Sequence, residues 1–413
     1  MSEPRIKTSR SETIIRPTPS SPQTCPSLSR GFLKKKLCIL AQLKNNVSFL
    51  EVLNQLGPQA PRNARFLAQR APFSCSRRAA LAAGGAALLG LGALGGCSWG
   101  KRTSGADKPA TGSTFAFDTY CTFTVYGDGS ALAKLSDACQ RFDALFDLYD
   151  DASDIAHINA GKGQPVTVDP DTVDLITRAL AFCKQADGRF DITIGAVSTL
   201  WDFDKGVRPA DEQIAAALPH VNWQNVIVDE NANTVQLTDP EAKLDLGGIA
   251  KGYVADRLCE LLRNETEATA AVLSLGGNIA FYGQKPGGGT WDTGIRDPND
   301  PGGNTTVGTA HVTGGSLVTS GLYERTFELD GITYWHILDP RTGMPVQTDT
   351  ESVTVACPSS TTADALSTTL FVAGSSEGAA IADAHKDTAA YFLLQKGSTA
   401  ESSRWQELTD FEA

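Results

Sequence analysis

The feature that most constrains this chain is the segment from Cys75 to Cys97, whose residues 79–96 are uncharged and which separates two parts of different composition. Ser76-Arg77-Arg78 precedes a stretch of Ala, Leu and Gly that ends in Leu94-Gly95-Gly96-Cys97. This pattern is typical of a twin-arginine export signal that closes in a lipoprotein cleavage site. The alternative is a transmembrane helix, because residues 79–96 are just long enough to span a bilayer. The glycines and the terminal cysteine favour the signal.

Charge differs sharply on the two sides of this run. Residues 1–96 carry 14 Lys+Arg and 3 Asp+Glu, a net charge of +11, whereas residues 97–413 carry 22 and 44, a net charge of −22. The acidic part argues against a nucleic-acid partner. If Cys97 becomes a lipidated N-terminus, it would anchor this part to the cell membrane, facing outside the cytoplasm.

The domain organisation expected from these shifts has four parts. Residues 1–74, rich in Ser, Pro, Arg and Lys, are far longer than a usual signal n-region and are predicted to be an unstructured leader, with a start codon assigned too early. Residues 75–97 form the signal and 98–113 a polar spacer. Residues 114–413 are expected to fold as a single catalytic domain of one or two lobes, because their apolar and charged contents are those of a globular protein.

The cysteines of the body do not indicate a disulfide framework. They are odd in number, no CxxC pair occurs, and several occupy apolar helical positions. Buried free thiols are therefore favoured over a disulfide or metal cluster. The residues are Cys121, Cys139, Cys183, Cys259 and Cys357.

Periodicity predicts a mixture of helices and strands without a regular βαβ rhythm, so a layered α+β fold is favoured over a doubly wound sheet. Helices are predicted within 130–150, 169–186 and 243–264, the last after a strand at 243–246 and a glycine pair. A first strand is predicted at 113–127, a strand at Ile192-Thr193-Ile194 and a hairpin at 221–239. Further short strands are predicted within 270–283, 290–298, 309–321, 332–340, 351–358 and 389–395.

Asp364 and Thr368 form the first candidate site, because they stand four residues apart in Asp364-Ala-Leu-Ser-Thr368. On a helix they would share one face and could both offer oxygen to a hard cation such as Mg²⁺. Taken alone, the pair is more often a helix cap followed by a solvated threonine.

Asp245-Leu-Gly-Gly-Ile-Ala-Lys-Gly252 is the second candidate. A glycine pair before a helix lets the backbone approach a ligand, and the helix N-terminus with Lys251 favours phosphate. The stretch matches neither standard nucleotide motif, and a close-packed turn is an equally good interpretation.

Asp191, in Gly188-Arg-Phe-Asp-Ile-Thr-Ile-Gly195, would be a half-buried carboxylate with a specific partner, which could be structural. Leu275-Gly276-Gly277-Asn278 is a further glycine-pair candidate. His336 precedes the turn signal Asp339-Pro-Arg-Thr-Gly343. By itself, such a histidine is more often a hydrogen-bonded core residue than a metal ligand or base.

Taken together and in order, these stretches resemble the ApbE family, the FAD:protein FMN transferases. The resemblance runs from about Phe117 to Gly374. It is carried by FDTYCTF, YDDASDIAHIN, GRFDITIG with LWDF, LDLGGIAKGYVADR, LSLGG, SLVTSGLYER, WHILDPRTG and SVTVACPSSTTADALSTTLFVAG.

The resemblance implies a T-fold-like α+β domain that binds FAD with Mg²⁺ and transfers FMN to a Thr or Ser of an exported or membrane flavoprotein, releasing AMP. It places the flavin and adenine contacts on Phe117, Tyr149, Arg189, Phe190, Asp191, Asp245, Lys251 and His336. It places the Mg²⁺ ligands on Asp364, Thr368 and a backbone carbonyl near Gly248. His336 falls at the family's active-site histidine and is the expected base for the acceptor hydroxyl, with Asp364 at the metal site as a competitor.

Two positions depart from the family pattern. Phe117 replaces a methionine that touches the flavin, and Leu322 replaces a polar residue. Two other activities fit the same residues: a Mg²⁺-dependent FAD diphosphatase, in which water replaces the threonine, and a flavin-binding lipoprotein without catalysis.

Overall fold

The structure of the protein is a computed structural model that describes residues 108–300 and 305–413. The predicted leader, signal and lipidated Cys97 lie outside these residues. None of the helices in the described part is both long and apolar enough to cross a membrane. The prediction of an α+β fold is confirmed.

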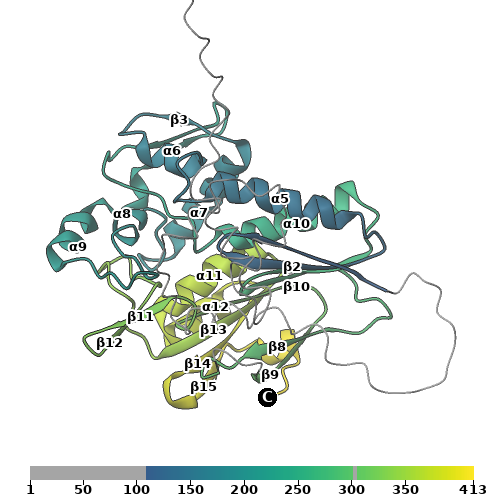
Figure 1. The fold of residues 1–413 in the computed structure, drawn as a ribbon. Coiled ribbons are helices and arrows are strands. Elements are labelled where there is room, and N and C mark those ends of the chain that lie inside the picture. Colours follow the sequence, from purple (N-terminus) through teal and green to yellow (C-terminus); the bar gives the residue numbers. More distant parts are fainter. Residues whose placement is uncertain (1–107, 301–304) are drawn as a thin grey trace, which may run out of the picture. The chain divides into compact units, whose positions relative to one another are not determined.

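An antiparallel sheet of eight strands forms the centre of the domain (Figure 1). The strands alternate their side chains between two buried faces, as a sheet covered on both sides requires. In spatial order they are β1 (Ala110–Ala116), β2 (Thr119–Tyr126), β6 (Ala270–Leu275), β7 (Asn278–Gly283), β10 (Gly315–Gly321), β13 (Thr350–Cys357), β14 (Ala389–Leu394) and β15 (Thr399–Glu401).

The predicted first strand is wrong in one respect, because residues 113–127 contain a hairpin. β1 and β2 pair around Phe117 and Asp118, whose φ angles are 54° and 55°. Two consecutive residues with positive φ form the tight turn that suits the twist of a hairpin. β1 also begins at Ala110, inside the predicted spacer, because β2 is long enough to pair with it there, with Ala110 opposite Val125.

Long helices cover one face of the sheet. α5 (Ala131–Phe146) and α10 (Ala250–Glu265) pack over β1, β2, β6 and β7, while α11 (Ser360–Ala373) and α12 (Ser375–Ala384) cover β10, β13 and β14. The opposite face is covered by the hairpin β8 (Trp291–Arg296) and β9 (Thr306–Val312) and by α13 (Trp405–Thr409). Phe281 of β7 stacks there on Trp291, with ring centroids 5.6 Å apart.

A smaller group of elements extends from the helical face and includes the segments that reach the site. The predicted hairpin at 221–239 is confirmed as β4 (Val226–Asp229) and β5 (Thr234–Leu237), joined by β3 (Val166–Thr167). Its helices are α6 (Asp154–Ala160), α7 (Pro170–Gln185), α8 (Gly195–Ser198) and α9 (Asp211–Ala217), with 3-10 turns at Leu218–His220 and Trp223–Asn225. A separate hairpin consists of β11 (Thr326–Leu329) and β12 (Ile332–Trp335).

The strands predicted at 192–194 and 243–246 do not form. One bridge, between Ile194 and Lys243, remains. Asp191 and Asp245 instead accept backbone N–H groups two residues ahead, from Thr193 at 2.8 Å and Gly247 at 2.9 Å. Such local side-chain bonds hold the backbone in turns and compete with strand pairing. The five cysteines are free, as predicted, and all but Cys259 are buried.

Candidate active site

The site is built where α10 and α11 come closest. Gly252 lies at the contact, and a Cβ built on it would lie 2.3 Å from the Ser360 carbonyl oxygen and 2.6 Å from the Asp364 Cβ. Real Cβ atoms do not approach backbone so closely, so only glycine permits this distance between the helices. The glycine of the Asp245–Gly252 stretch therefore brings the two predicted motifs together.

Asp364 lies inside α11, buried to 4% exposure, and does not cap its own helix. Ser359 is the cap of α11. The Asp364 carboxylate instead accepts the Gly252 N–H of α10 at 2.8 Å and a second backbone N–H, that of Lys251. Burial raises the pKa of this carboxyl, while the Lys251 charge and these amides oppose the rise. Among the described residues no side chain donates a hydrogen bond to it, so it retains capacity for a cation.

Thr368 lies one turn after Asp364, as predicted for a shared helix face. A Cβ built on Gly248 would lie 3.1 Å from the Thr368 Oγ1 and 3.1 Å from the Phe190 Cε2, so the loop backbone runs between these side chains. The resulting set is one carboxylate, one hydroxyl and the backbone near Gly248, all hard oxygen donors. Such a set fits Mg²⁺, which holds few protein carboxylates and keeps waters or substrate phosphates as its other ligands. Within the described residues there is no cluster of three or more His, Cys, Asp or Glu that could hold a metal.

His336 faces the same region with two cations near it. Its backbone N–H donates to the Arg325 carbonyl at 3.1 Å, and its buried Nδ1 has no hydrogen-bond partner in the described part of the chain. Burial, together with the charges of Arg325 and Lys251, lowers the pKa of His336 to about 3. The imidazole is therefore neutral near pH 7 and can accept a proton.

Lys251 lies in the first turn of α10, and its Nζ donates to the Gly247 carbonyl at 3.2 Å. Its charge acts on both Asp364 and His336. The N-cap residue of α10, Ile249, supplies no side-chain acceptor. A helix N-terminus combined with a lysine favours an anionic group such as phosphate.

Tyr149 and Asp245 border this region. Tyr149 is 68% exposed, which leaves its ring open for stacking. Partial loss of water around its hydroxyl, and then the charge of Asp245, raise the Tyr149 pKa, which Arg325 opposes. Asp245 is bound by the protein itself, since Ser198 Oγ donates to its Oδ2 at 2.7 Å and the Gly247 N–H to its Oδ1.

Two other predicted residues, Arg189 and Asp191, have their polar groups bound by the protein itself. The Arg189 guanidinium pairs with Glu377 at 2.6 Å and with Asp187 at 3.2 Å. The buried Asp191 accepts from Thr193 and from the Trp223 N–H at 3.0 Å. These bonds position the loop around Phe190, and direct contacts of Arg189 and Asp191 with a ligand stay predictions.

Phe117 lies in the β1–β2 turn, where its N–H donates to Asp143 Oδ1 at 2.7 Å and its ring packs partly on the core. Its neighbour Asp118 reaches Arg325 at 3.3 Å. The turn therefore touches the site through Asp118, whereas a flavin contact by Phe117 stays a prediction.

Sequence reasoning assigned no role to Glu324 and Arg325, although both belong to the quoted SLVTSGLYER stretch. Glu324 is exposed at the surface, yet loss of water around its carboxyl raises its pKa, and Lys251 and Arg325 oppose this. A Cβ on Gly277 would lie 3.2 Å from Glu324 Oε1 and 2.7 Å from the Thr319 carbonyl oxygen. The glycine pair of Leu275–Asn278 thus leaves room for this carboxylate, a contact between distant segments that spacing does not reveal.

Hydroxyl and amide groups of neighbouring strands hold α11 in place. Ser320 Oγ of β10 lies 2.7 Å from Ser367 Oγ, and Ser360 Oγ donates to the buried Asn278 Oδ1 at 2.7 Å. Leu322, which departs from the family pattern, packs against the apolar cluster beneath α11. Its side chain is therefore used in packing at this position.

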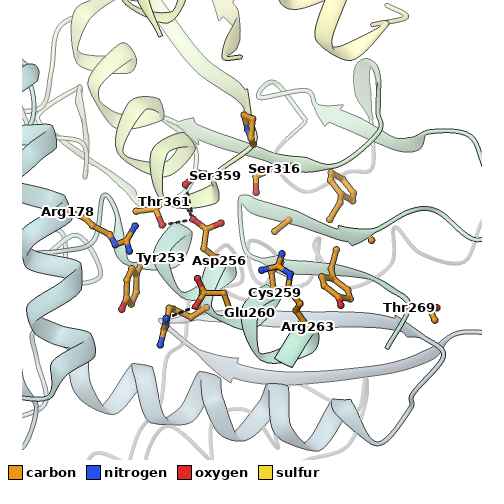
Figure 2. A pocket seen from close by; sticks show the side chains of 17 residues that line it. Arg178, Tyr253, Asp256, Cys259, Glu260, Arg263, Thr269, Ser316, Ser359 and Thr361 are labelled. Atoms are coloured by element: carbon orange, nitrogen blue, oxygen red, sulfur yellow. Dashed lines mark hydrogen bonds and ion pairs between the residues drawn. The ribbon is translucent and has the colours of Figure 1, made fainter. Parts of the chain in front are cut away.

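A cavity of about 550 Å³ lies along α10, beside β7 and the start of α11 (Figure 2). It is lined by Arg178, Asp256 and Arg263, among others, and by none of the predicted site residues. Asp256 points from α10 to the start of α11, where it accepts the Ser360 and Thr361 N–H groups, both at 2.9 Å. Arg178 pairs with Asp174. Asp256 and Arg178 are thus bound by neighbouring groups of the protein.

Comparison with known proteins gives consistent results. The model of the ApbE family matches residues 117–392. A protein of Treponema pallidum (strain Nichols) named FAD:protein FMN transferase is 35% identical over 316 residues, which cover 71% of this chain and 85% of that protein. A protein of the same name from Klebsiella pneumoniae (strain 342) is 35% identical over 283 residues, 68% and 87% of the two chains.

Solved structures agree in fold. The crystal structure of the ApbE protein from Thermotoga maritima superposes with a TM-score of 0.68 at 31% identity and covers 73% of this chain and 99% of its own. The apo form of the Pseudomonas stutzeri flavinyl transferase ApbE gives a TM-score of 0.64 at 26% identity, with 73% and 97% covered.

Proposed function

This chain belongs to the ApbE family and is an FAD:protein FMN transferase, and we propose that it uses Mg²⁺ to move FMN from FAD to a Thr or Ser hydroxyl of a flavoprotein, releasing AMP. The observation that carries the proposal is the oxygen set of Asp364, Thr368 and the Gly248 backbone, brought beside Lys251 and His336 by the contact at Gly252.

FMN transfer breaks the diphosphate of FAD, so the site must offset negative charge on the phosphate oxygens. When bound, Mg²⁺ would polarise phosphate oxygens and offset the charge that develops as the P–O–P bridge breaks. Asp364 and Thr368 would hold it, with Asp364 kept in place by backbone N–H groups of α10. Lys251 and the start of α10 would bind the remaining phosphate charge.

In the transfer step the acceptor hydroxyl oxygen forms a bond to the phosphorus of the FMN half. The bond between that phosphorus and the bridging oxygen breaks, and AMP leaves with the bridging oxygen. His336 takes the hydroxyl proton, which it can do because it is neutral before the step. Its basicity is lowered first by burial and then by the charges of Arg325 and Lys251, so a bound diphosphate that offsets these charges would raise its affinity for the proton.

Flavin recognition is assigned to the border of the site. The exposed ring of Tyr149 would stack on one aromatic part of FAD, and Phe190, Asp245 and Lys251 would complete the contact. Arg189 and Asp191 would act by holding the loop that carries Phe190.

For location, the proposed place of action is the outer side of the cell membrane, with Cys97 lipidated. The support is the sequence of residues 75–97. Radiolabelled palmitate incorporated by the full chain and not by a Cys97→Ala variant would support the anchor, whereas equal labelling of the two would reject it.

The central experiment incubates the protein with FAD, Mg²⁺ and a flavoprotein encoded next to it that carries a Thr or Ser acceptor. We expect the acceptor mass to increase by one FMN, with an equal amount of AMP released and both products lost in EDTA. FMN that appears free in solution with AMP, and never on the acceptor, would identify a diphosphatase instead.

A further inference from the structure

We infer that the tip of the β11–β12 hairpin, with Val207 beside it, is the docking surface for the acceptor flavoprotein. This inference rests on the proposed transfer to a protein hydroxyl and adds where the protein substrate binds. The apolar tip is defined as Val207, Leu329 and Ile332, which are 46%, 39% and 56% exposed. They are three of the five large apolar side chains exposed among the described residues.

The apolar tip continues the buried face of the hairpin out into solvent. Phe327 pairs with Tyr334, and Leu329 with Ile332, so all four side chains lie on one face, because residues two apart in a strand share a face. Phe327 and Tyr334 stack on each other at 5.3 Å and pack against Trp201. Leu329 and Ile332 lie beyond this support, and the protein leaves their side chains substantially uncovered.

Val207 belongs to the same surface. It follows Gly206, on which a Cβ would lie 3.6 Å from the Phe327 ring, and its N–H donates to the Asp202 carbonyl at 2.8 Å. The aromatic cluster under the hairpin thus packs against the segments that carry both parts of the apolar tip. A rigid support lowers the entropy that association costs.

The base of the same hairpin enters the active site. β11 starts after Glu324 and Arg325, and the ladder extends by one more bond, from the His336 N–H to the Arg325 carbonyl. Ile332 and His336 are four residues apart, about 13 Å along an extended strand. A protein seated on the apolar tip would therefore have its surface within a short loop's reach of the proposed base.

Charge around the tip indicates what the partner must offer. Glu328 and Asp330 are exposed beside Leu329, and in the described part of the chain neither forms an ion pair. The nearby cations are already paired, Lys205 with Asp202 and Arg208 with Asp211. The complementary surface on the acceptor is therefore apolar with Lys or Arg at its rim, separate from the segment that holds the Thr or Ser.

The test compares two acceptors in the assay of FMN attachment: the folded flavoprotein domain that the wild-type protein modifies, and a synthetic peptide of about 15 residues around its acceptor residue. The variant is Leu329→Glu/Ile332→Glu, and the matched control is Ile227→Glu on β4, where Ile227 is 50% exposed away from the hairpin. We expect the variant to raise the KM for the folded domain at least about tenfold, as loss of a central apolar contact does. The KM for FAD and the rate with the peptide should stay at wild-type values.

Charge reversal gives an independent second variant that keeps the apolar residues. Glu328→Lys/Asp330→Lys should raise the KM for the folded domain and make it less sensitive to salt. An unchanged KM in both hairpin variants, or an equal rise in the Ile227→Glu control, overturns the inference. If the wild-type protein modifies neither acceptor, the proposed function itself fails, and the two failures are thereby distinguished.

Discussion

Asp256 and Asp364 do the same structural work at opposite ends of one helix contact. Asp256, on α10, accepts the first backbone N–H groups of α11, while Asp364, on α11, accepts N–H groups at the start of α10. Each helix therefore receives its N-terminal partner from the other helix. This reciprocal capping satisfies donors that would be costly to leave unpaired in a buried contact.

The two carboxylates differ in what else reaches them. Asp256 Oδ2 also accepts the Ser359 and Thr361 hydroxyls, at 2.9 and 2.7 Å, so its acceptor capacity is filled by the protein. Among the described residues, Asp364 accepts hydrogen bonds from backbone groups only, and burial raises its pKa. Two aspartates in matching roles thus separate into a saturated cap and a carboxylate with capacity for a ligand, which explains why chemistry is assigned to Asp364.

The largest expected effect comes from removing the Asp364 charge. Asp364→Asn keeps the shape of the side chain and one acceptor for the Gly252 N–H, but it loses the charge that would hold Mg²⁺. We expect FMN transfer to fall about 10³-fold, since a catalytic cation contributes several kcal/mol to the transition state. Mass spectrometry of the acceptor over time, across a range of Mg²⁺ concentrations, measures this. A rate within threefold of wild type would remove Asp364 from the metal site.

Gly252→Ala should disturb both caps at once. The added methyl would lie 2.3 Å from the Ser360 carbonyl oxygen, so α10 and α11 must separate. We expect the free energy of unfolding to fall by about 3 kcal/mol, at the upper end of overpacking effects, with transfer activity falling as well. Urea unfolding measures the first effect. Gly314→Ala is the matched control, because a Cβ there would meet nothing within 4 Å; equal losses in both variants would contradict the explanation.

Asp256→Asn tests the saturated member of the pair. An amide can accept at only one oxygen, and its NH₂ would face donors that now point at Asp256. We expect the free energy of unfolding to fall by about 2 kcal/mol, while the transfer rate of the folded fraction stays within threefold of wild type. A rate loss as large as that of Asp364→Asn would mean that the two carboxylates are not functionally distinct.

The same residues show which features of the fold and the site can be predicted from the sequence. Periodicity and capping signals predicted α5 and α7 well, because both helices carry a local apolar stripe and α7 starts at its own cap, Asp169. The prediction that Asp364 and Thr368 share a helix face is confirmed for the same reason. The reciprocal caps cannot be predicted from local sequence patterns, since each joins residues more than a hundred positions apart.

The failures have physical causes that are also non-local or unusual. Phe117-Asp118 lacks the Asn-Gly type of signal that marks a two-residue turn, so one long strand was predicted where a hairpin forms. Asp191 and Asp245 form local turns that replace the predicted strands. The surroundings of His336 depend on Arg325 and Lys251 from other segments, and no spacing rule gives them.

The smallest expected effect concerns His336. The charge of Lys251 lowers the pKa of His336 and also acts on the carboxylate of Asp364. Its pKa is about 3 in the folded protein, below the ordinary value of 6.5. Below pH 6.5 the unfolded chain therefore takes up a proton at His336 that the folded protein does not. The stability that neutral His336 contributes is fully present above this pH and is lost as the pH falls toward 3. His336→Gln removes this contribution, and the decrease in Tm between pH 7 and pH 5 should be about 3 °C smaller in the variant than in wild type. Thermal unfolding at the two pH values measures it, with the exposed His157→Gln as control. An identical decrease in all three proteins would show that His336 is not held neutral in the folded protein. The charge of Lys251 would then not act on His336 as it acts on Asp364.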